Sequence, residues 1–438
     1  MKSVDGRTSP ACDVDVLFVN TYEKNGGAAR AAYRIFSEIR NRSINAHYLT
    51  LTKEDPDINI SGPIHTSTMG VLVRALTRLD KIPLYFYPHR KQGAFSPNFW
   101  PNPLRVRLSH FRSRLVHLHW VCAGMLAVED LARLNCPIVW TLHDAWAFTG
   151  GCHYTRGCEG FKRQCGYCPQ LGSEGENDCS RHLMHKKEEV FGKLNITVVA
   201  PSRWLADMAR QSSLFAQRRI EVIPNGLDTE IFTPVHKYTA RKRLGMQSEN
   251  PVLLFGAQEV TDPRKGWDLL CAALRGLMGS YTLLVFGKGN ACVENAPHVT
   301  VCQLGSLADD QRLALIYSAA DVYICPSRED NLPNTVAEAF ACATPCAAFA
   351  VNGLTDMIEH QKNGWLARPF DSADLAHGIE WLLRHPEQDQ LRRAARDKAV
   401  MDYSLAVMSN RYMAVYEEVL NAHGEKDAAE IRSHTGWR

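Results

Sequence analysis

Short apolar runs alternate with helical patterns along the whole chain, and this alternation limits the fold more than any other feature. Such alternation is typical of parallel sheets covered by helices. Eight runs are predicted as strands, four in each half: residues 14–20, 114–120, 137–143, 196–202, 251–257, 281–287, 322–327 and 344–350. The sequence therefore predicts an α/β protein rather than a sandwich or a helical bundle.

The chain is too long for one hydrophobic core, because 438 residues exceed the size at which chains usually divide into domains. Two prolines and an Asn-Gly pair interrupt regular structure near the middle, so we expect a hinge at 224–234. The predicted parts are an N-terminal domain over 1–225 with a Cys-rich insertion at 150–180, a C-terminal domain over 226–400, and a helix with a frayed tail over 401–438. The frayed part is expected over the polar stretch 421–438.

No apolar run approaches the roughly 18 residues of a membrane-spanning helix, and the first residues lack an apolar signal core. We therefore expect a soluble cytoplasmic protein. The stretch 71–115 nevertheless carries nine Lys and Arg against one Asp, a local charge of +8. It is either a solvated basic surface or a peripheral contact with anionic headgroups or a phosphorylated lipid acceptor at the inner membrane face.

Two segments are candidate phosphate sites, because ligands of open parallel sheets bind beyond the carboxyl ends of strands, where helix starts offer N–H groups. Gly26 and Gly27 follow the first predicted strand, and glycines let backbone amides approach a phosphate closely; an ordinary glycine turn is the alternative. Arg264 and Lys265 precede another helix start, where two cations suit a diphosphate. A solvated Arg-Lys pair is the alternative there.

The loop at 326–335 is the most specific candidate, since it joins a buried strand to an apolar helix through turn-forming residues. We expect the amides of 332–336 to be free for an anion. Asp330 and Glu338 are eight residues apart, so both could face one cleft and accept hydrogen bonds from sugar or ribose hydroxyls. Alternatively, Glu338 merely favours the helix start electrostatically.

Histidines mark the corresponding strand ends in the N-terminal half, namely His117, His119 and His143. A single histidine is usually structural, but three at one sheet edge favour a site. We expect His143 to contact the transferred sugar and Asp144 to orient it or to position the acceptor. His119 and the adjacent Trp120 are expected on the acceptor side.

Six segments resemble, in order, the landmarks of glycosyltransferase family 4, whose members are retaining enzymes with the GT-B fold. They are VIPNGLD (222–228), DPRKGWDLL (262–270), VFGKG (285–289), LIYSAADVYICPS (315–327), EDNLPNTVAEAFACATP (329–345) and NGWLARP (363–369). NGGAARAA near the start and TLHDAWAFTGGCHY are similar to a subgroup typical of colanic-acid-like exopolysaccharide clusters. The resemblance implies two Rossmann-like domains facing across a cleft, with a C-terminal helix crossing back to the N-terminal domain.

The resemblance also implies roles for individual residues. Lys265 would bind the donor diphosphate, Glu338 the ribose and Asp330 the donor sugar. The implied donor-binding set is Gly26, Gly27, Arg264, Lys265, Glu329, Asp330, Asn331, Leu332, Pro333, Asn334, Thr335 and Glu338. The family usually has Glu where Asp330 stands and Glu329 is adjacent, so either carboxylate could reach the sugar. Many members carry an Arg where this chain has Ala257-Gln258, and Arg264 could supply that charge.

The implied reaction is retaining transfer of a hexosyl or deoxyhexosyl group from a UDP- or GDP-linked sugar to a saccharide or lipid-linked acceptor. In such folds the leaving diphosphate helps to deprotonate the acceptor, and cations such as Lys265 and Arg264 replace a catalytic metal, so none is expected. A nucleotide-sugar epimerase of the same fold is the alternative enzyme. A weaker alternative is a nucleic-acid-binding protein with a zinc module, although no nucleic acid is expected as partner.

Four cysteines stand within seventeen residues, at Cys152, Cys158, Cys165 and Cys168. In a reducing compartment this clustering indicates a metal rather than disulfides, and four thiolates suit a closed structural zinc site. Cys179 and His153 are possible substitutes as ligands. Disulfides or free thiols are the alternatives, because the first spacing is not that of a standard zinc knuckle.

Overall fold

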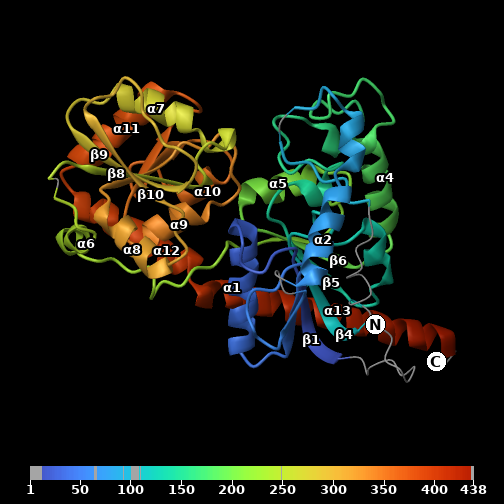
Figure 1. Cartoon of the computed structure of the whole chain (residues 1–438). Helices are drawn as coiled ribbons and strands as arrows, with labels where there is room; N and C mark the ends of the chain where they lie inside the picture. Colours follow the sequence, from blue (N-terminus) through green and yellow to red (C-terminus); the bar gives the residue numbers. More distant parts are fainter. Residues whose placement is uncertain are drawn as a thin grey trace. The chain divides into compact units, whose positions relative to one another are not determined.

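The computed structural model describes residues 12–63, 67–91, 93–99, 108, 110–247 and 249–435, without the side chains of 69, 72, 74, 76 and 425–435. Arg105, Arg107 and the side chain of Arg74, which belong to the predicted basic stretch, therefore lie outside the described residues. The chain forms two compact units (Figure 1). Unit 1 comprises 1–201, 205–223 and 409–438, and unit 2 comprises 202–204 and 224–408.

Unit 1 is built on a seven-stranded sheet in the order β3-β2-β1-β4-β5-β6-β7, in which every pairing is parallel. The strands are β1 (Cys12–Val19), β2 (Ala46–Leu49), β3 (Ile60–Ser61), β4 (Phe111–Leu118), β5 (Ile138–Thr141), β6 (Ile196–Ala200) and β7 (Ile220–Val222). The helices are α1 (Gly27–Asn41), α2 (Thr68–Leu79), α4 (Cys179–Phe191), α5 (Arg203–Gln211) and, at the end of the chain, α13 (Leu405–Thr435). Because β4 pairs with both β1 and β5, the carboxyl ends of these three strands lie side by side.

Unit 2 is built on a six-stranded parallel sheet in the order β10-β9-β8-β11-β12-β13. The strands are β8 (Val252–Glu259), β9 (Tyr281–Lys288), β10 (Val299–Gly305), β11 (Val322–Cys325), β12 (Cys346–Phe349) and β13 (Gly364–Ala367). The helices are α6 (Lys237–Arg243), α7 (Trp267–Arg275), α8 (Asp310–Ala319), α9 (Asn334–Ala341), α10 (Leu354–Met357), α11 (Ser372–Arg384) and α12 (Gln388–Tyr403). The predicted α/β class with two Rossmann-like domains is confirmed.

All eight predicted strands are present, but five further strands were not predicted: β2, β3, β7, β10 and β13. Four of them, β2, β3, β7 and β13, have four residues or fewer, which is too short for a recognisable apolar run. The edge strand β10 alternates exposed and half-buried positions, so its sequence lacks a continuous apolar run. Helix α13 continues to Thr435, within the stretch 421–438 that was predicted to fray.

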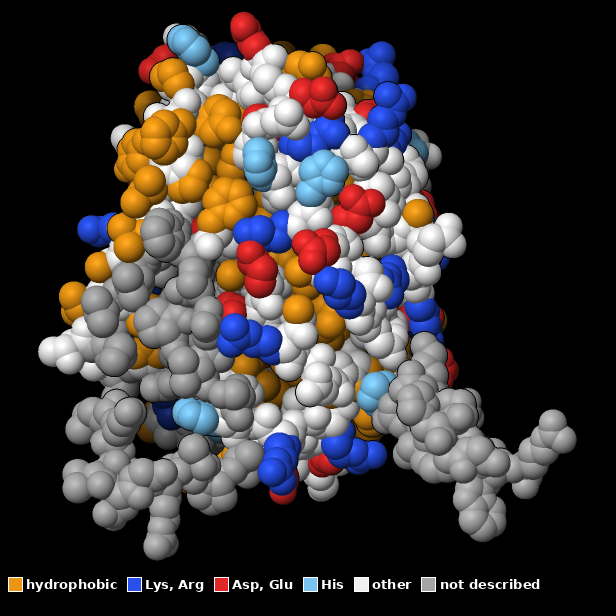
Figure 2. Space-filling model, turned by 90° about the vertical axis from the view of Figure 1, so that its right-hand side faces the viewer, with side chains coloured by type: hydrophobic (Ala, Val, Ile, Leu, Met, Phe, Trp, Pro, Cys, Tyr) orange, Lys and Arg blue, Asp and Glu red, His pale blue; other side chains and the backbone are white. Residues whose placement is uncertain are grey.

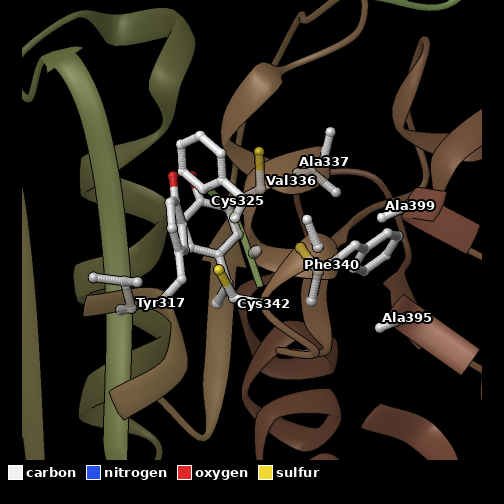
Figure 3. Packing of buried hydrophobic residues seen from close by; sticks show 14 of the residues in the cluster. Tyr317, Cys325, Val336, Ala337, Phe340, Cys342, Ala395 and Ala399 are labelled. Atoms are coloured by element: carbon white, nitrogen blue, oxygen red, sulfur yellow. The ribbon is translucent and has the colours of Figure 1, made fainter. Parts of the chain in front are cut away.

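The core of unit 2 fixes helix α9 against its neighbours. Val336 and Phe340 are fully buried, and Phe340 lies beside Ala395 and Ala399 of α12 (Figure 3). Small side chains on α12 let the two helices approach closely, while the aromatic ring fills the space between them. This packing fixes the orientation of α9 and of the loop that precedes it.

Helix α13 is tied to the sheet of unit 1 by buried polar contacts. Tyr416 Oη is hydrogen-bonded to Nδ1 of His117 at 2.7 Å, and Nε2 of His117 to Oγ1 of Thr141 at 2.7 Å. Thr141 Oγ1 is in turn 2.9 Å from Oη of Tyr412. Burial lowers the pKa of His117 well below its usual value, so the ring is neutral and both nitrogens have a partner. No helix in the described part of the chain is long and apolar enough to cross a membrane.

We expect Tyr416→Phe to lower the free energy of unfolding by about 1–3 kcal/mol, because the buried Nδ1 of His117 loses its partner. Urea unfolding followed by tryptophan fluorescence measures this. Tyr85→Phe is the matched control, since Tyr85 is 79% exposed in the same unit and should change nothing. Equal stability of both variants would contradict the role given to the Tyr416 hydroxyl.

Candidate functional site

Two loops of unit 2 meet at the carboxyl ends of the adjacent strands β8 and β11. A Cβ on Gly266, whose φ is +68°, would lie 1.9 Å from the carbonyl oxygen of Pro326, so only glycine allows this approach. The backbone N–H of Arg328 donates to the carbonyl oxygen of Arg264 at 2.7 Å. The predicted 262–266 and 326–335 segments therefore form one surface, as the end-of-strand rule requires.

An ion pair joins these two loops. Lys265 Nζ lies 2.5 Å from Oδ2 of Asp330, and the same oxygen accepts a hydrogen bond from Ser327 Oγ at 3.1 Å. Burial opposes the charge of Asp330, but Lys265, Arg264 and the Ser327 hydroxyl together lower its pKa below the usual value. The carboxylate is thus charged at neutral pH, and the side chain of Lys265 is held at the loop junction.

The arginines beside this pair are held differently. Arg264 donates to Oδ2 of Asp262 at 2.6 Å and to the carbonyl oxygen of Glu329 at 3.4 Å. Arg328 instead makes a bidentate pair with Asp268, at 2.7 and 2.6 Å. Of the two adjacent acidic residues, the structure places the carboxylate of Asp330 against Lys265, whereas Glu329 presents its backbone oxygen to Arg264.

Glu338 lies on α9 and is 3% exposed. Its Oε2 accepts a hydrogen bond from Oη of Tyr317 at 3.1 Å. Because it is the fifth residue of a helix that starts at Asn334, it lies beyond the first turn, where the charge of a helix terminus has its effect. The electrostatic helix-start alternative therefore does not account for this buried carboxylate.

The loop before α9 is fixed by side-chain contacts. Asn331 Oδ1 accepts from Ser202 Oγ at 2.6 Å, and Asn225 Nδ2 donates to Oδ1 of Asn334 at 3.2 Å. One expectation is corrected: the N–H of Val336 donates to the carbonyl oxygen of residue 333 at 3.0 Å, so it is not free for an anion. Residue 333 is a proline and has no N–H to offer.

In unit 1, the predicted residues gather where β4 and β5 end. His119 Nδ1 lies 3.1 Å from Nε2 of His143. Burial lowers the pKa of His143 to about 4, against the attraction of Asp144, and burial lowers the pKa of His119 well below its usual value. Both rings are thus neutral at physiological pH and can exchange a hydrogen bond but carry no charge.

Asp144 holds the side chains around it in place. Its Oδ2 accepts from Nε1 of Trp120 at 2.8 Å and lies 2.6 Å from Nδ1 of His153, while Oδ1 accepts from the N–H of Trp146 at 2.9 Å. Burial works against the charge, but His153 and these donors lower the pKa of Asp144. His153 was missed as a partner of Asp144, although the nine-residue separation within one motif was visible in the sequence.

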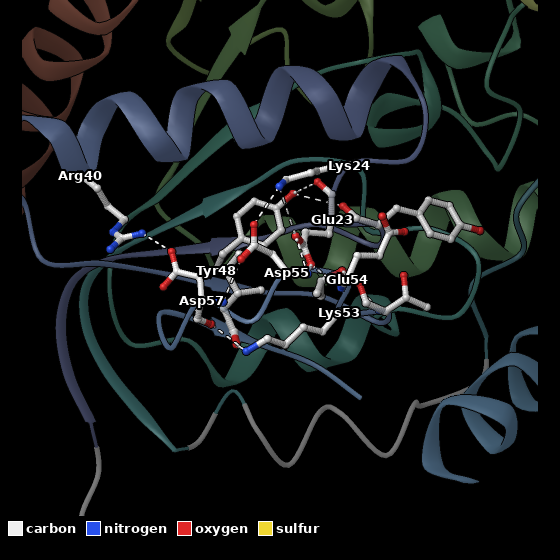
Figure 4. A network of polar contacts seen from close by, with 12 residues as sticks. Glu23, Lys24, Arg40, Tyr48, Lys53, Glu54, Asp55 and Asp57 are labelled. Atoms are coloured by element: carbon white, nitrogen blue, oxygen red, sulfur yellow. Dashed lines mark hydrogen bonds and ion pairs between the residues drawn. The ribbon is translucent and has the colours of Figure 1, made fainter. Parts of the chain in front are cut away.

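Gly26, with φ +97°, precedes the first residue of α1. The segment before it is held by Glu23, whose fully buried carboxylate accepts from the backbone N–H groups of Glu54 at 2.6 Å and of Asp55 at 3.1 Å (Figure 4). Lys24 pairs with Asp55 at 2.9 Å. Sequence reasoning missed Glu23, because its partners follow a strand that was not predicted.

The structure therefore brings the candidate residues together in two groups. Unit 2 joins Arg264, Lys265 and Asp330 on two packed loops, with Glu338 on the helix that follows. Unit 1 joins His119, Trp120, His143 and Asp144 at the ends of β4 and β5, next to the strand that leads to Gly26 and Gly27.

Both units of the chain match known protein-family models. Residues 25–231 match the model described as Glycosyltransferase Family 4, and residues 250–385 match the one described as Glycosyl transferases group 1. This chain is a glycosyltransferase. The two matches cover most of units 1 and 2 respectively, so the enzyme belongs to the family whose landmarks its sequence resembles, and the epimerase and nucleic-acid alternatives are set aside.

Two curated relatives of this chain are also named glycosyltransferases. This chain is 28% identical over 341 residues to a D-inositol 3-phosphate glycosyltransferase of Mycobacteroides abscessus, covering 74% of this chain and 69% of that one. It is 27% identical over 322 residues to the putative colanic acid biosynthesis glycosyl transferase WcaC of Escherichia coli, covering 69% and 72%.

Solved structures share the fold of the glycosyltransferase. Sucrose-phosphate synthase from Thermosynechococcus elongatus matches with a TM-score of 0.69 at 18% identity, over 94% of this chain and all of that one. Anabaena HepE, solved with UDP and glucose, matches with a TM-score of 0.64 at 17% identity, over 92% of this chain and all of that one. These likenesses confirm the GT-B fold.

The neutral His143 predicts a pH dependence of stability. Unfolded, this histidine takes up a proton near pH 6.5, whereas in the folded enzyme it stays neutral down to about pH 4. The free energy of unfolding must therefore fall as pH is lowered from 6.5 to 4. We expect His143→Gln to reduce this slope but not to abolish it, because burial also lowers the pKa values of His47, His117 and His119.

Urea unfolding at a series of pH values measures this slope. His185→Gln, which changes a half-exposed histidine on α4, should leave the slope as in the unchanged enzyme. Equal slopes for His143→Gln and the unchanged enzyme would show that His143 is not held neutral in the fold.

Proposed function

We propose that the glycosyltransferase transfers a hexosyl or deoxyhexosyl group, with retention, from a nucleotide-diphosphate sugar to a saccharide or lipid-linked saccharide in exopolysaccharide biosynthesis. The observation that carries this proposal is the ion pair between Lys265 and Asp330 on two loops at the strand ends of unit 2. This ion pair holds the ammonium group of Lys265 beside Arg264, beyond the carboxyl ends of the strands, where parallel sheets bind phosphates.

In this proposal the cations serve the leaving group. Transfer breaks the bond between the anomeric carbon and the diphosphate oxygen, so negative charge grows on that oxygen. Lys265 and Arg264 would stabilise this charge electrostatically, and the leaving diphosphate would take the proton of the acceptor hydroxyl. Asp330, which is charged and buried, would accept hydrogen bonds from hydroxyls of the donor sugar.

Further residues would complete the donor and acceptor contacts. Glu338 would hold the ribose through its buried carboxylate. His143 is neutral, so it would accept or donate a hydrogen bond to the transferred sugar without adding charge, and His119 and Trp120 would lie toward the acceptor. Asp144 would fix the orientation of Trp120.

The relatives support the substrate class. HepE was solved with UDP-glucose as well as with UDP, which favours a nucleotide-sugar donor, and WcaC carries a colanic-acid name. The proposed diphosphate contacts would not involve the base, so they would accept UDP and GDP alike.

A lipid-linked acceptor would bring the enzyme to the cytoplasmic face of a membrane. Unit 1 exposes large apolar side chains in one segment, α2 and the short helix η1 (Ile82–Phe86) that follows it: Val71, Leu79, Ile82, Tyr85 and Phe86. Lys and Arg in the same segment would meet anionic headgroups. Figure 2 shows a face on which hydrophobic side chains gather beside Lys and Arg.

Thermal-shift measurements with a panel of nucleotide sugars test the proposed function directly. A donor present at a hundred times its dissociation constant should add about 2.7 kcal/mol of stability. Incubation of the shifting donor with saccharide acceptors, with the product anomer read by NMR, then tests retention. A panel without any shift, or an inverted product, would contradict the proposal.

Lys265→Ala should lower kcat for transfer by roughly 10²–10³-fold, because one cation facing the developing charge is lost. Lys362→Ala is the matched control, since Lys362 is 67% exposed and pairs only with surface carboxylate Glu359 among the described residues. Steady-state rates with both variants, after thermal unfolding has shown that each is folded, measure the effect. Near-normal turnover of Lys265→Ala would reject its role.

Glu338→Gln should weaken binding of a ribonucleoside diphosphate, while binding of its 2′,3′-dideoxy analogue should change little. The reason is that the analogue lacks the ribose hydroxyls from which the Glu338 carboxylate would accept hydrogen bonds. Calorimetric titration of both nucleotides into both proteins separates a ribose contact from a structural effect. If the variant loses the same affinity for both nucleotides, Glu338 does not bind the ribose.

A further inference from the structure

The cysteine-rich segment between β5 and α4 surrounds one small cavity. Cys152, Cys158, Cys165 and Cys168 all line it, and its volume of about 20 Å³ admits one water-sized sphere. Phe95 and Phe161 contribute apolar walls. None of the four cysteines is in a disulfide.

The sulfurs of Cys158 and Cys165 both lie close to Gly160. A Cβ on Gly160 would lie 3.5 Å from Sγ of Cys158 and 3.7 Å from Sγ of Cys165. The N–H of Gly160 donates to Sγ of Cys158 at 3.4 Å. Such a hydrogen bond stabilises a thiolate more than a thiol, because the acceptor then carries the charge.

A buried lysine lies within electrostatic reach of the cluster. Lys187 is fully buried, and burial lowers its pKa to about 7, against the attraction of Cys122, Cys165 and Cys152. Its ammonium group donates to the carbonyl oxygens of Trp146 and Thr149, neither of which carries a charge to neutralise it. Four thiolates around a divalent ion would carry a net charge of −2, which Lys187 would partly balance.

The other candidate ligands are engaged elsewhere. His153 Nε2 is 2.9 Å from Oγ of Ser96, and its Nδ1 is 2.6 Å from Oδ2 of Asp144, so both ring nitrogens have partners. Cys179 lies in an apolar cluster with Cys168 and Leu84 but does not line the cavity. The ligand set is therefore the four cysteines alone.

We propose that Cys152, Cys158, Cys165 and Cys168 bind one structural zinc ion. Thiolates are soft ligands, and a closed set of four suits tetrahedral zinc. As the side chains stand, no group of three or more His, Cys, Asp or Glu in the described residues is arranged to hold a metal, so binding requires the sulfurs to turn into the cavity. The ion would fasten the loop that carries His153 and thereby support Asp144.

Metal analysis of the purified full-length enzyme tests the site without using its activity. We expect about one zinc ion per chain. When a mercurial reagent modifies the thiols, one zinc ion should be released for every four thiols that react. Protein produced with cobalt in place of zinc should show the thiolate-to-metal charge transfer and visible bands of a tetrahedral site. Less than about half a zinc ion per chain with these thiols free, or disulfides among them by mass spectrometry, would overturn the proposal.

Variants identify the ligands. Cys165→Ser should lose the zinc and unfold at a lower temperature, whereas Cys292→Ser, at an exposed cysteine of unit 2, should keep both properties. Full zinc content in folded Cys165→Ser would overturn the ligand set. If Cys165→Ser does not fold, the zinc content and cobalt spectrum of the unchanged enzyme still decide whether the site exists.

Discussion

The ion pair between Lys265 and Asp330 is the interaction on which the proposed donor site depends. Two loops that are 65 residues apart in the chain meet through it, and the left-handed Gly266 lets their backbones touch. Removing one partner of this partly buried pair leaves the other charge uncompensated, which costs more stability than the intact pair contributes. The pair therefore orients the side chain of Lys265 and is not a major source of stability.

The same rule determines where each unit places its candidate site residues. Parallel strands end at one edge, helix starts follow them, and polar residues placed after the strands lie together even when far apart in sequence. In unit 1 the rule gathers two neutral histidines and a charged aspartate, and in unit 2 it gathers cations and a charged aspartate. Burial explains the difference, because it suppresses the charge of His143, while nearby donors preserve that of Asp144.

The fold could be predicted wherever a strand is a continuous apolar run, as in β1, β8 and β9. It could not be predicted at β2, β10 or β13, where short length or half-exposed positions erase the pattern. The residues of the unit 2 loops were found from their position after strands. Glu23, His153 and Lys187 were not assigned their roles, because each has partners that only the folded chain brings near.

The central claim is that Lys265, oriented by Asp330, recognises the second phosphate of the donor. Calorimetric comparison of nucleoside diphosphate and monophosphate binding, in the unchanged enzyme and in Lys265→Ala, tests it most directly. The account predicts that the enzyme prefers the diphosphate and that the substitution abolishes this preference while monophosphate binding stays nearly the same. An unchanged preference, or an equal loss for both nucleotides, would contradict it.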